Sequence, residues 1–137
     1  MSRSSNKATA RAFVSRLLIA LVSGFALWNV VRLSLAEWSS GGACPSLAGV
    51  PACYVVAVAY LLVLLSALIN KAPLYRRLFI AGAGIVLSLA AMGSFTQVMG
   101  IAECPKTASG LPMCYISLGL GVLLIGLFVV REKAAAA

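Results

Sequence analysis

The four cysteines of this chain have its most distinctive chemistry, and they occur as two pairs in near-copies of one motif. The motif runs from Cys44 to Tyr54 and again from Cys104 to Tyr115, and both copies end in Pro-x-Cys-Tyr. Paired thiols can close a disulfide, exchange with other thiols or bind a soft metal ion. Neither spacing is the short one of about two to four residues found in zinc sites. We therefore expect no metal site.

The segments that flank the two motifs are long and apolar. Of the 137 residues, 62% are hydrophobic and 10% are charged, whereas a soluble domain has about 25% charged residues. Four apolar segments, each close to the roughly 20 residues that a helix needs to span a bilayer, cover residues 17–38, 50–70, 78–100 and 111–130. The sequence predicts an all-α integral membrane protein with a four-transmembrane-helix bundle. Backbone groups have no water to bond in lipid, so helices are the expected spanning form.

The first segment has an alternative interpretation as a cleaved signal peptide, because basic residues precede it. It is longer than the usual signal core and has no clear cleavage site, so we expect a retained helix. The alanines at 134–137 are expected to form a frayed end.

The basic residues are concentrated on one side of the expected topology. All of the 11 Lys and Arg residues except Arg32 and Lys106 fall in a basic N-terminal segment (1–16), a turn (71–77) or a tail (131–137). The positive-inside rule places these three segments in the cytoplasm and both cysteine loops outside it. We expect the plasma (inner) membrane of a bacterium. The lipid bilayer then explains the net charge of +8, and no folded element for reading nucleic acid is present.

Cysteines outside the cytoplasm are usually oxidised. Four cysteines allow three pairings. The simplest pairs Cys44 with Cys53 and Cys104 with Cys114, because each pair then brackets one hairpin. Closing a loop of about ten residues stabilises the folded state by roughly 2.7 kcal/mol in the chain-entropy model.

The two halves of the chain align with each other. The segment at 16–20 matches the segment at 77–81, and Pro51-x-Cys53-Tyr54 matches Pro112-x-Cys114-Tyr115. We therefore expect two tandem helical hairpins, repeat 1 over 17–70 and repeat 2 over 78–130. Each has two spans, so the repeats are predicted to be related by a parallel pseudo-twofold axis along the membrane normal.

Two extracytoplasmic cysteine pairs on a four-helix membrane protein resemble the broad plan of the DsbB-type disulfide-generating proteins and of the vitamin K epoxide reductase family. That resemblance implies a thiol–disulfide oxidoreductase coupled to a membrane quinone, with Cys44, Cys53, Cys104 and Cys114 as its redox residues. Both families have a Cys-x-x-Cys pair beside the quinone, and this chain has none. Its two loops are also near-equivalent, whereas an electron relay needs two different potentials.

Polar residues inside the spans are few. Asn29 and Arg32 in the first segment and Thr96 and Gln97 in the third lie at comparable depth and are expected to line a polar pocket beneath the loops. The alternatives are that Arg32 extends to the lipid headgroups and that the others bond between helices. The chain has no histidine and no aspartate, so paired-carboxylate, Ser/His/Asp and Cys/His catalysis are excluded.

These observations favour a non-catalytic accessory or assembly subunit of a larger membrane complex, without a cofactor. Its partner is expected to be another membrane protein or a second copy of the chain. The alternative is the quinone-coupled oxidoreductase, in which Arg32 would polarise a quinone oxygen. An oligomeric small-solute transporter is the third hypothesis, and the nearly unbroken apolar second and fourth segments disfavour it for a monomer.

Overall fold

The structure of the protein is a computed structural model, and it describes residues 2–42 and 44–136. Three residues lie outside the description. They are Met1 of the basic N-terminal segment, Ala43 of the first cysteine loop and Ala137 of the tail.

Four helices form nearly the whole of the described chain. They are α1 (Ser2–Ser40), α2 (Ala52–Leu68), α3 (Ala72–Val98) and α4 (Met113–Ala136). Two-residue strands, β1 (Ser46–Leu47) and β2 (Val50–Pro51), pair antiparallel in the first cysteine loop. The expectation of an all-helical fold with four helices is confirmed, and three of these helices are long and apolar.

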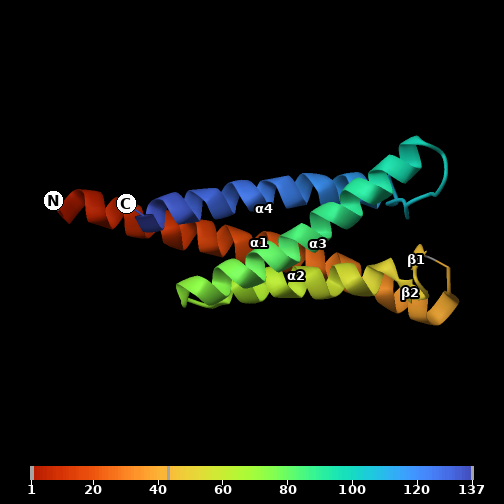
Figure 1. The fold of residues 1–137 in the computed structure, drawn as a ribbon, viewed down its shortest axis with the longest axis horizontal. Helices are drawn as coiled ribbons and strands as arrows, with labels where there is room; N and C mark the ends of the chain where they lie inside the picture. Colours follow the sequence, from red (N-terminus) through yellow and green to blue (C-terminus); the bar gives the residue numbers. More distant parts are fainter. Residues whose placement is uncertain (1, 43, 137) are drawn as a thin grey trace.

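The helices run up and down the long axis of the molecule (Figure 1). α1 packs against α2 and α4, and α3 packs against the same two helices. α3 runs obliquely, from beside the end of α2 to the start of α4 (Figure 1). Buried side chains from all four helices form the core: Ile19, Ala26, Ala59, Tyr60, Val63, Ala67, Phe79, Ala83, Val86 and Leu124. The ring of Phe79 stacks on that of Phe128 with centroids 4.2 Å apart, which joins α3 to α4.

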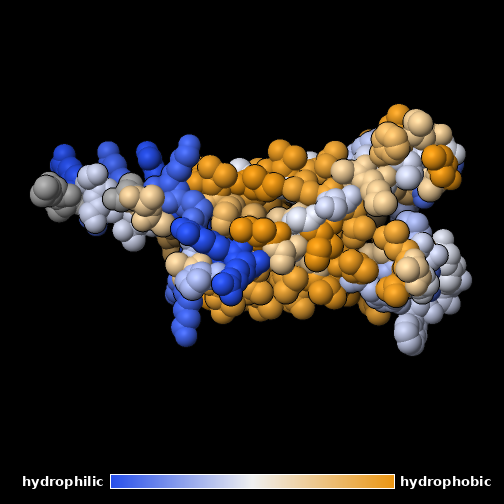
Figure 2. All heavy atoms as spheres, in the orientation of Figure 1, coloured by the Kyte–Doolittle hydropathy of each residue, from blue (hydrophilic) through white to orange (hydrophobic). Residues whose placement is uncertain are grey.

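Three helices, α1, α3 and α4, are long and apolar enough to cross a membrane. α2 is apolar but has 17 residues, which is about 25 Å of helix. On the face of the molecule seen in Figure 2, an apolar belt covers the middle, with hydrophilic residues at both ends. Many large apolar side chains are exposed there, including Phe25 (66%) and Ile80 (64%). A belt of this kind suits lipid rather than water, as expected for a membrane protein.

The helices extend further than the expected spans. α1 begins at Ser2 and α4 continues to Ala136, because the flanking segments have no proline or glycine and include several Ala, Arg and Lys residues, which favour helix. The expected turn over 71–77 is too long, since α3 already begins at Ala72. Pro73 lies in the first turn of α3, where its missing N–H has no helical partner to lose. It therefore suits the start of this helix.

Glycines set the closest helix contacts. A Cβ atom at Gly82 would lie 2.6 Å from the carbonyl oxygen of Ala59, so α3 approaches α2 at backbone distance. A Cβ at Gly121 would lie 2.8 Å from Leu87 of α3. Gly24 and Gly84, also in small-residue pairs of the sequence, face open space. Small-residue spacing alone does not identify the packing face.

The C-terminal end of α2 is held by arginines from the two helices beside it. The last carbonyls of a helix have no partner within the helix. Arg16 of α1 donates from Nε to the oxygen of Ala67 (3.1 Å), and Arg131 of α4 donates to the oxygens of Ser66 (3.2 Å) and Ile69 (3.3 Å). Cations at a helix C-terminus are also favoured by the helix dipole.

Arg131 is only 5% exposed although it is charged. Its guanidinium lies over the ring of Tyr75, 3.8 Å from the centroid, which is a favourable cation–π position. The Tyr75 hydroxyl donates to Glu132, and Glu132 also pairs with Arg76. α3 is thereby fastened to α4 beside the end of α2.

Replacing Arg131 with methionine should destabilise the protein by about 2–4 kcal/mol, because the buried carbonyls of Ser66 and Ile69 lose their donor. Methionine keeps most of the side-chain volume. Unfolding in detergent micelles measures the change. The matched control is Arg77→Met in the exposed part of α3, which should have little effect. Equal destabilisation by both variants would show that Arg131 does not hold the end of α2.

Candidate functional site

The first cysteine loop is a short hairpin closed by a disulfide. Cys44 is joined to Cys53, with Cα atoms 6.0 Å apart. Ser46 and Leu47 pair with Pro51 and Val50, and the turn between them has positive φ at Ala48 (50°) and Gly49 (85°). The N–H of Ala52 donates to the oxygen of Pro45 (2.9 Å). This bond connects the start of the loop to the first turn of α2.

The second loop has the same frame. Cys104 is joined to Cys114, with Cα atoms 6.2 Å apart. Lys106 and Pro112 form an isolated antiparallel β-bridge, and the N–H of Met113 donates to the oxygen of Pro105 (2.9 Å). The one extra residue of this loop lies in its turn. The turn is closed by bonds between Thr107, Gly110 and Leu111.

A side chain from the preceding helix caps each loop. Glu37 accepts hydrogen bonds from the N–H groups of Gly42 (3.1 Å) and Cys44 (2.9 Å). Gln97 accepts a longer one from the N–H of Cys104 (3.4 Å). Each cap residue stands seven positions before the first cysteine of its loop. Sequence reasoning missed this role, although the shared spacing in the two copies was a usable signal.

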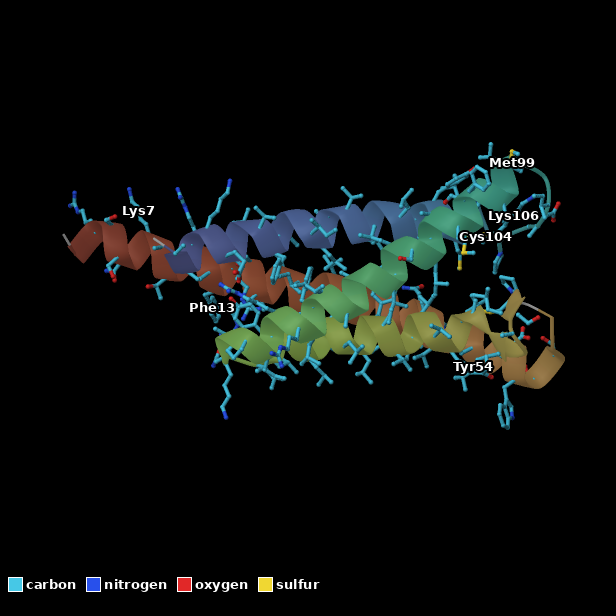
Figure 3. The ribbon with its side chains drawn as sticks, viewed as in Figure 1. Lys7, Phe13, Tyr54, Met99, Cys104 and Lys106 are labelled. Atoms are coloured by element: carbon cyan, nitrogen blue, oxygen red, sulfur yellow. A yellow bond between two sulfur atoms is a disulfide. The ribbon has the colours of Figure 1, made fainter. Side chains whose placement is uncertain are left out.

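A cavity of about 310 Å³ lies between the two loops. All four helices and both loops contribute to its wall, which is mainly apolar: Val30, Leu33, Val56, Val86, Leu89 and Ala90 are among its residues. Cys53, Cys104 and Cys114 also reach the wall, so both disulfides border one space. Figure 3 shows Cys104 at this end of the molecule, beside α3. An apolar cavity of this kind suits an apolar molecule or chain.

α3 passes directly against the second disulfide at Gly93. A Cβ atom there would lie 2.7 Å from the Sγ of Cys114 and 3.3 Å from the Sγ of Cys104. Only glycine leaves room for the sulfur atoms at this point. Cys104 is 6% exposed and Cys44 and Cys53 are 7% exposed. Little of these three residues is open to an attacking thiol.

The expected polar pocket is not assembled. Asn29 and Arg32 lie on the exposed side of α1, where Asn29 bonds to the oxygen of Phe25 and Arg32 lies 5.9 Å from the ring centroid of Trp28. Thr96 is in the cavity wall and donates to the oxygen of Gly93. Gln97 is engaged with the second loop. Residues at one depth of two helices need not share a face, and here the helix rotation separates them.

The chemistry available at the cavity is limited. The four cysteines are all in disulfides. In residues 2–42 and 44–136, no three potential His, Cys, Asp or Glu ligands gather to hold a metal ion. Glu103 is the acidic residue of the wall. The geometry therefore favours binding of an apolar group over acid–base catalysis.

Comparison with known protein families, characterised proteins and solved structures gives no match for this chain.

Replacing Glu37 with leucine should speed the reduction of Cys44–Cys53 by about tenfold or more, because the loop loses charge-assisted bonds that hold it closed. Glu37→Gln should be reduced at a rate between those of the wild type and Glu37→Leu, since its single amide oxygen keeps one of the two acceptors, as Gln97 does in the other loop. Maleimide labelling of released thiols at fixed reductant concentration, read by mass spectrometry of the peptides, measures both rates. Cys104–Cys114 in the same molecule is the internal control. Equal acceleration of both disulfides would contradict a local role of Glu37.

Proposed function

We propose that the protein is a non-catalytic accessory subunit that packs against a larger membrane partner. The observation that carries the proposal is the shared frame of the two cysteine loops. Both have a disulfide, a cap from the preceding helix and a bond from the next helix to the proline oxygen. Two equivalent loops are expected if both have the same structural role, whereas an electron relay needs two cysteine pairs of different redox potential.

The same frame supports two tandem hairpin repeats related by a pseudo-twofold axis along the membrane normal. The cap residues and the first cysteines recur at one constant offset, and the extra residue of the second copy lies within its turn. A duplicated hairpin explains why this detail recurs in two loops that do not pair with each other.

The charge distribution supports an orientation in the bacterial plasma membrane. Figure 2 shows a dense group of hydrophilic residues at the end where both termini lie. The turn between α2 and α3 is at this end as well (Figure 1). Lys and Arg are favoured on the cytoplasmic side, so this end is proposed to be cytoplasmic. The disulfide loops then lie in the oxidising compartment.

The partner face is proposed on α1 around Arg32. Sixteen residues separate Arg32 from Arg16 at the basic end, which is about 24 Å of helix and less than the roughly 30 Å of a hydrocarbon core. Arg32 thus stands inside the apolar belt and on an exposed face with Trp28 (63% exposed) and Leu35 (65%). A charged residue at such depth is a functional candidate, and a polar or acidic group of a partner helix would pair with it.

A photoreactive phenylalanine analogue at position 28 should cross-link to a membrane protein of different sequence when cells are irradiated. The same analogue at position 80 is the matched control, because Trp28 and Ile80 are 63% and 64% exposed on different helices. Adding Arg32→Ala should lower the yield at position 28 by about fivefold, as expected for loss of one charged contact. Equal yields at both positions, or adducts only between copies of this chain, would contradict the proposal.

A second candidate, the quinone-coupled thiol oxidoreductase, is favoured by one observation: both disulfides border the same apolar cavity. In that reaction two electrons and two protons pass from a substrate dithiol, by way of a disulfide of the protein, to a quinone. The cavity is apolar enough for a quinone ring, and Thr96 and Ser117 place hydroxyl groups in its wall. Arg32, which we expected to polarise the quinone, lies on the exposed face of α1.

Replacing each cysteine pair with serines distinguishes the accessory subunit from the oxidoreductase. For an accessory subunit, Cys44→Ser/Cys53→Ser and Cys104→Ser/Cys114→Ser should each lower stability by about 2–4 kcal/mol, and the wild type should show no quinone-dependent oxidation of a dithiol. Unfolding in micelles and absorbance of a soluble quinone measure the two properties. The oxidoreductase hypothesis is correct if the wild type reduces quinone with electrons from the dithiol and if either double serine variant loses this activity without losing stability.

A further inference from the structure

A second cavity, which we call the inner cleft, lies at the opposite end of the molecule. It has a volume of about 400 Å³ and is formed by Lys7 and Arg11 of α1 with Val130 and Lys133 of α4. Lys7 extends from α1 close to the end of α4 (Figure 3). Lys7 and Arg11 are four residues apart and therefore lie on the same side of α1. Two helices thus contribute three cations to one space.

The positive charge of the inner cleft is not neutralised within the described part of the chain. The acidic residue at this end, Glu132, is engaged with Arg76 and Tyr75 of α3. The C-terminal dipole of α4 contributes about half a negative charge, against three full positive charges. Lys7, Arg11 and Lys133 are all exposed. The cleft thus presents net positive charge to an external anion.

The position of the inner cleft favours a lipid headgroup over a free anion as its ligand. Arg16 and Arg131 hold the end of α2, and the adjoining residues 17–31 of α1 and 113–130 of α4 carry no charge. Lys133 lies two residues after Arg131, which is about 3 Å along the helix. Arg11 and Lys7 lie five and nine residues before Arg16, which is about 8 and 14 Å along α1, so the cleft extends from the edge of the apolar belt outward through the layer of phospholipid headgroups.

The apolar surface that continues from the cleft also supports a lipid as the source of the anion. Along α4, helical spacing places Gly126 and Leu123 below Val130. Gly126 leaves open space where a side chain would be, and Leu123 and Val130 are both 48% exposed. On α1, Leu18 follows Arg11 by two turns and is 40% exposed. A headgroup in the cleft would continue into acyl chains along this surface.

We propose that the inner cleft binds the phosphate headgroup of an anionic phospholipid, with Lys7, Arg11 and Lys133 as ligands. Arg11 can hold two phosphate oxygens with its planar fork, and the lysines add point charges. Basic pockets between membrane helices recognise anionic headgroups in this way. The site is at the other end of the bundle from the disulfide loops and does not depend on the function proposed for them.

The test uses the full chain in detergent with added lipid, and native mass spectrometry measures the bound fraction. Phosphatidylglycerol should bind the wild type, and phosphatidylcholine, which has no net charge, should bind much less. Arg11→Gln/Lys133→Gln should weaken phosphatidylglycerol binding by about 30-fold, since each lost cation contact accounts for about fivefold. Both residues are exposed, so the fold should survive, and unfolding in micelles checks this.

The matched control is Lys71→Gln/Arg77→Gln, which removes one lysine and one arginine from exposed positions at the same end but outside the cleft. It should bind phosphatidylglycerol as the wild type does. Equal weakening by both double variants would mean general electrostatic attraction and would overturn the site. Equal binding of the two lipids, or displacement of phosphatidylglycerol by an equal concentration of glycerol phosphate, would overturn a lipid ligand.

Discussion

The structure depends on how the short helix α2 ends. Its 17 residues give about 25 Å of helix, less than a bilayer core, so its last carbonyls need partners that lipid does not supply. Arg16 and Arg131 reach these carbonyls from α1 and α4. The Tyr75–Glu132–Arg76 contacts then hold α3 at the same place. One requirement, the satisfaction of a few backbone oxygens, thereby fixes the position of all four helices at the basic end.

The opposite end follows from this anchoring. α3 starts beside the end of α2 and runs obliquely toward the start of α4 (Figure 1). Gly82 allows its closest approach to α2 near the middle, and Gly93 allows it to pass against the second disulfide. The two loops therefore stand on diverging helices and leave the apolar cavity between them. The disulfide of each loop and its cap, Glu37 or Gln97, hold the loop on its own helices.

The sequence was sufficient for the helical class, for the number of helices in the described residues and for three of the four apolar spans, because these depend on composition and length. It did not predict where the helices begin and end. Charged segments such as 1–16 were expected outside the helices, but Ala, Lys and Arg favour helix wherever water can reach them. It also missed the burial of Arg131, because a cation after an apolar run usually marks an interface. Its partners are carbonyls 62 and 65 positions away, which no local pattern can reveal.

The candidate site shows the same limit. Asn29, Arg32, Thr96 and Gln97 were grouped by depth, but depth along a helix does not determine the direction in which a side chain points. The structure gives the direction of each side chain, and the few polar groups then fall into two classes: those bonded within the protein and those that face outward. Glu37, Gln97, Glu132 and Arg131 are occupied with the protein's own backbone or side chains. Arg32 and the cations of the inner cleft face outward. The fold therefore uses the first four of these groups to satisfy its own backbone and side chains, and it leaves Arg32 and the cations of the inner cleft at its surface.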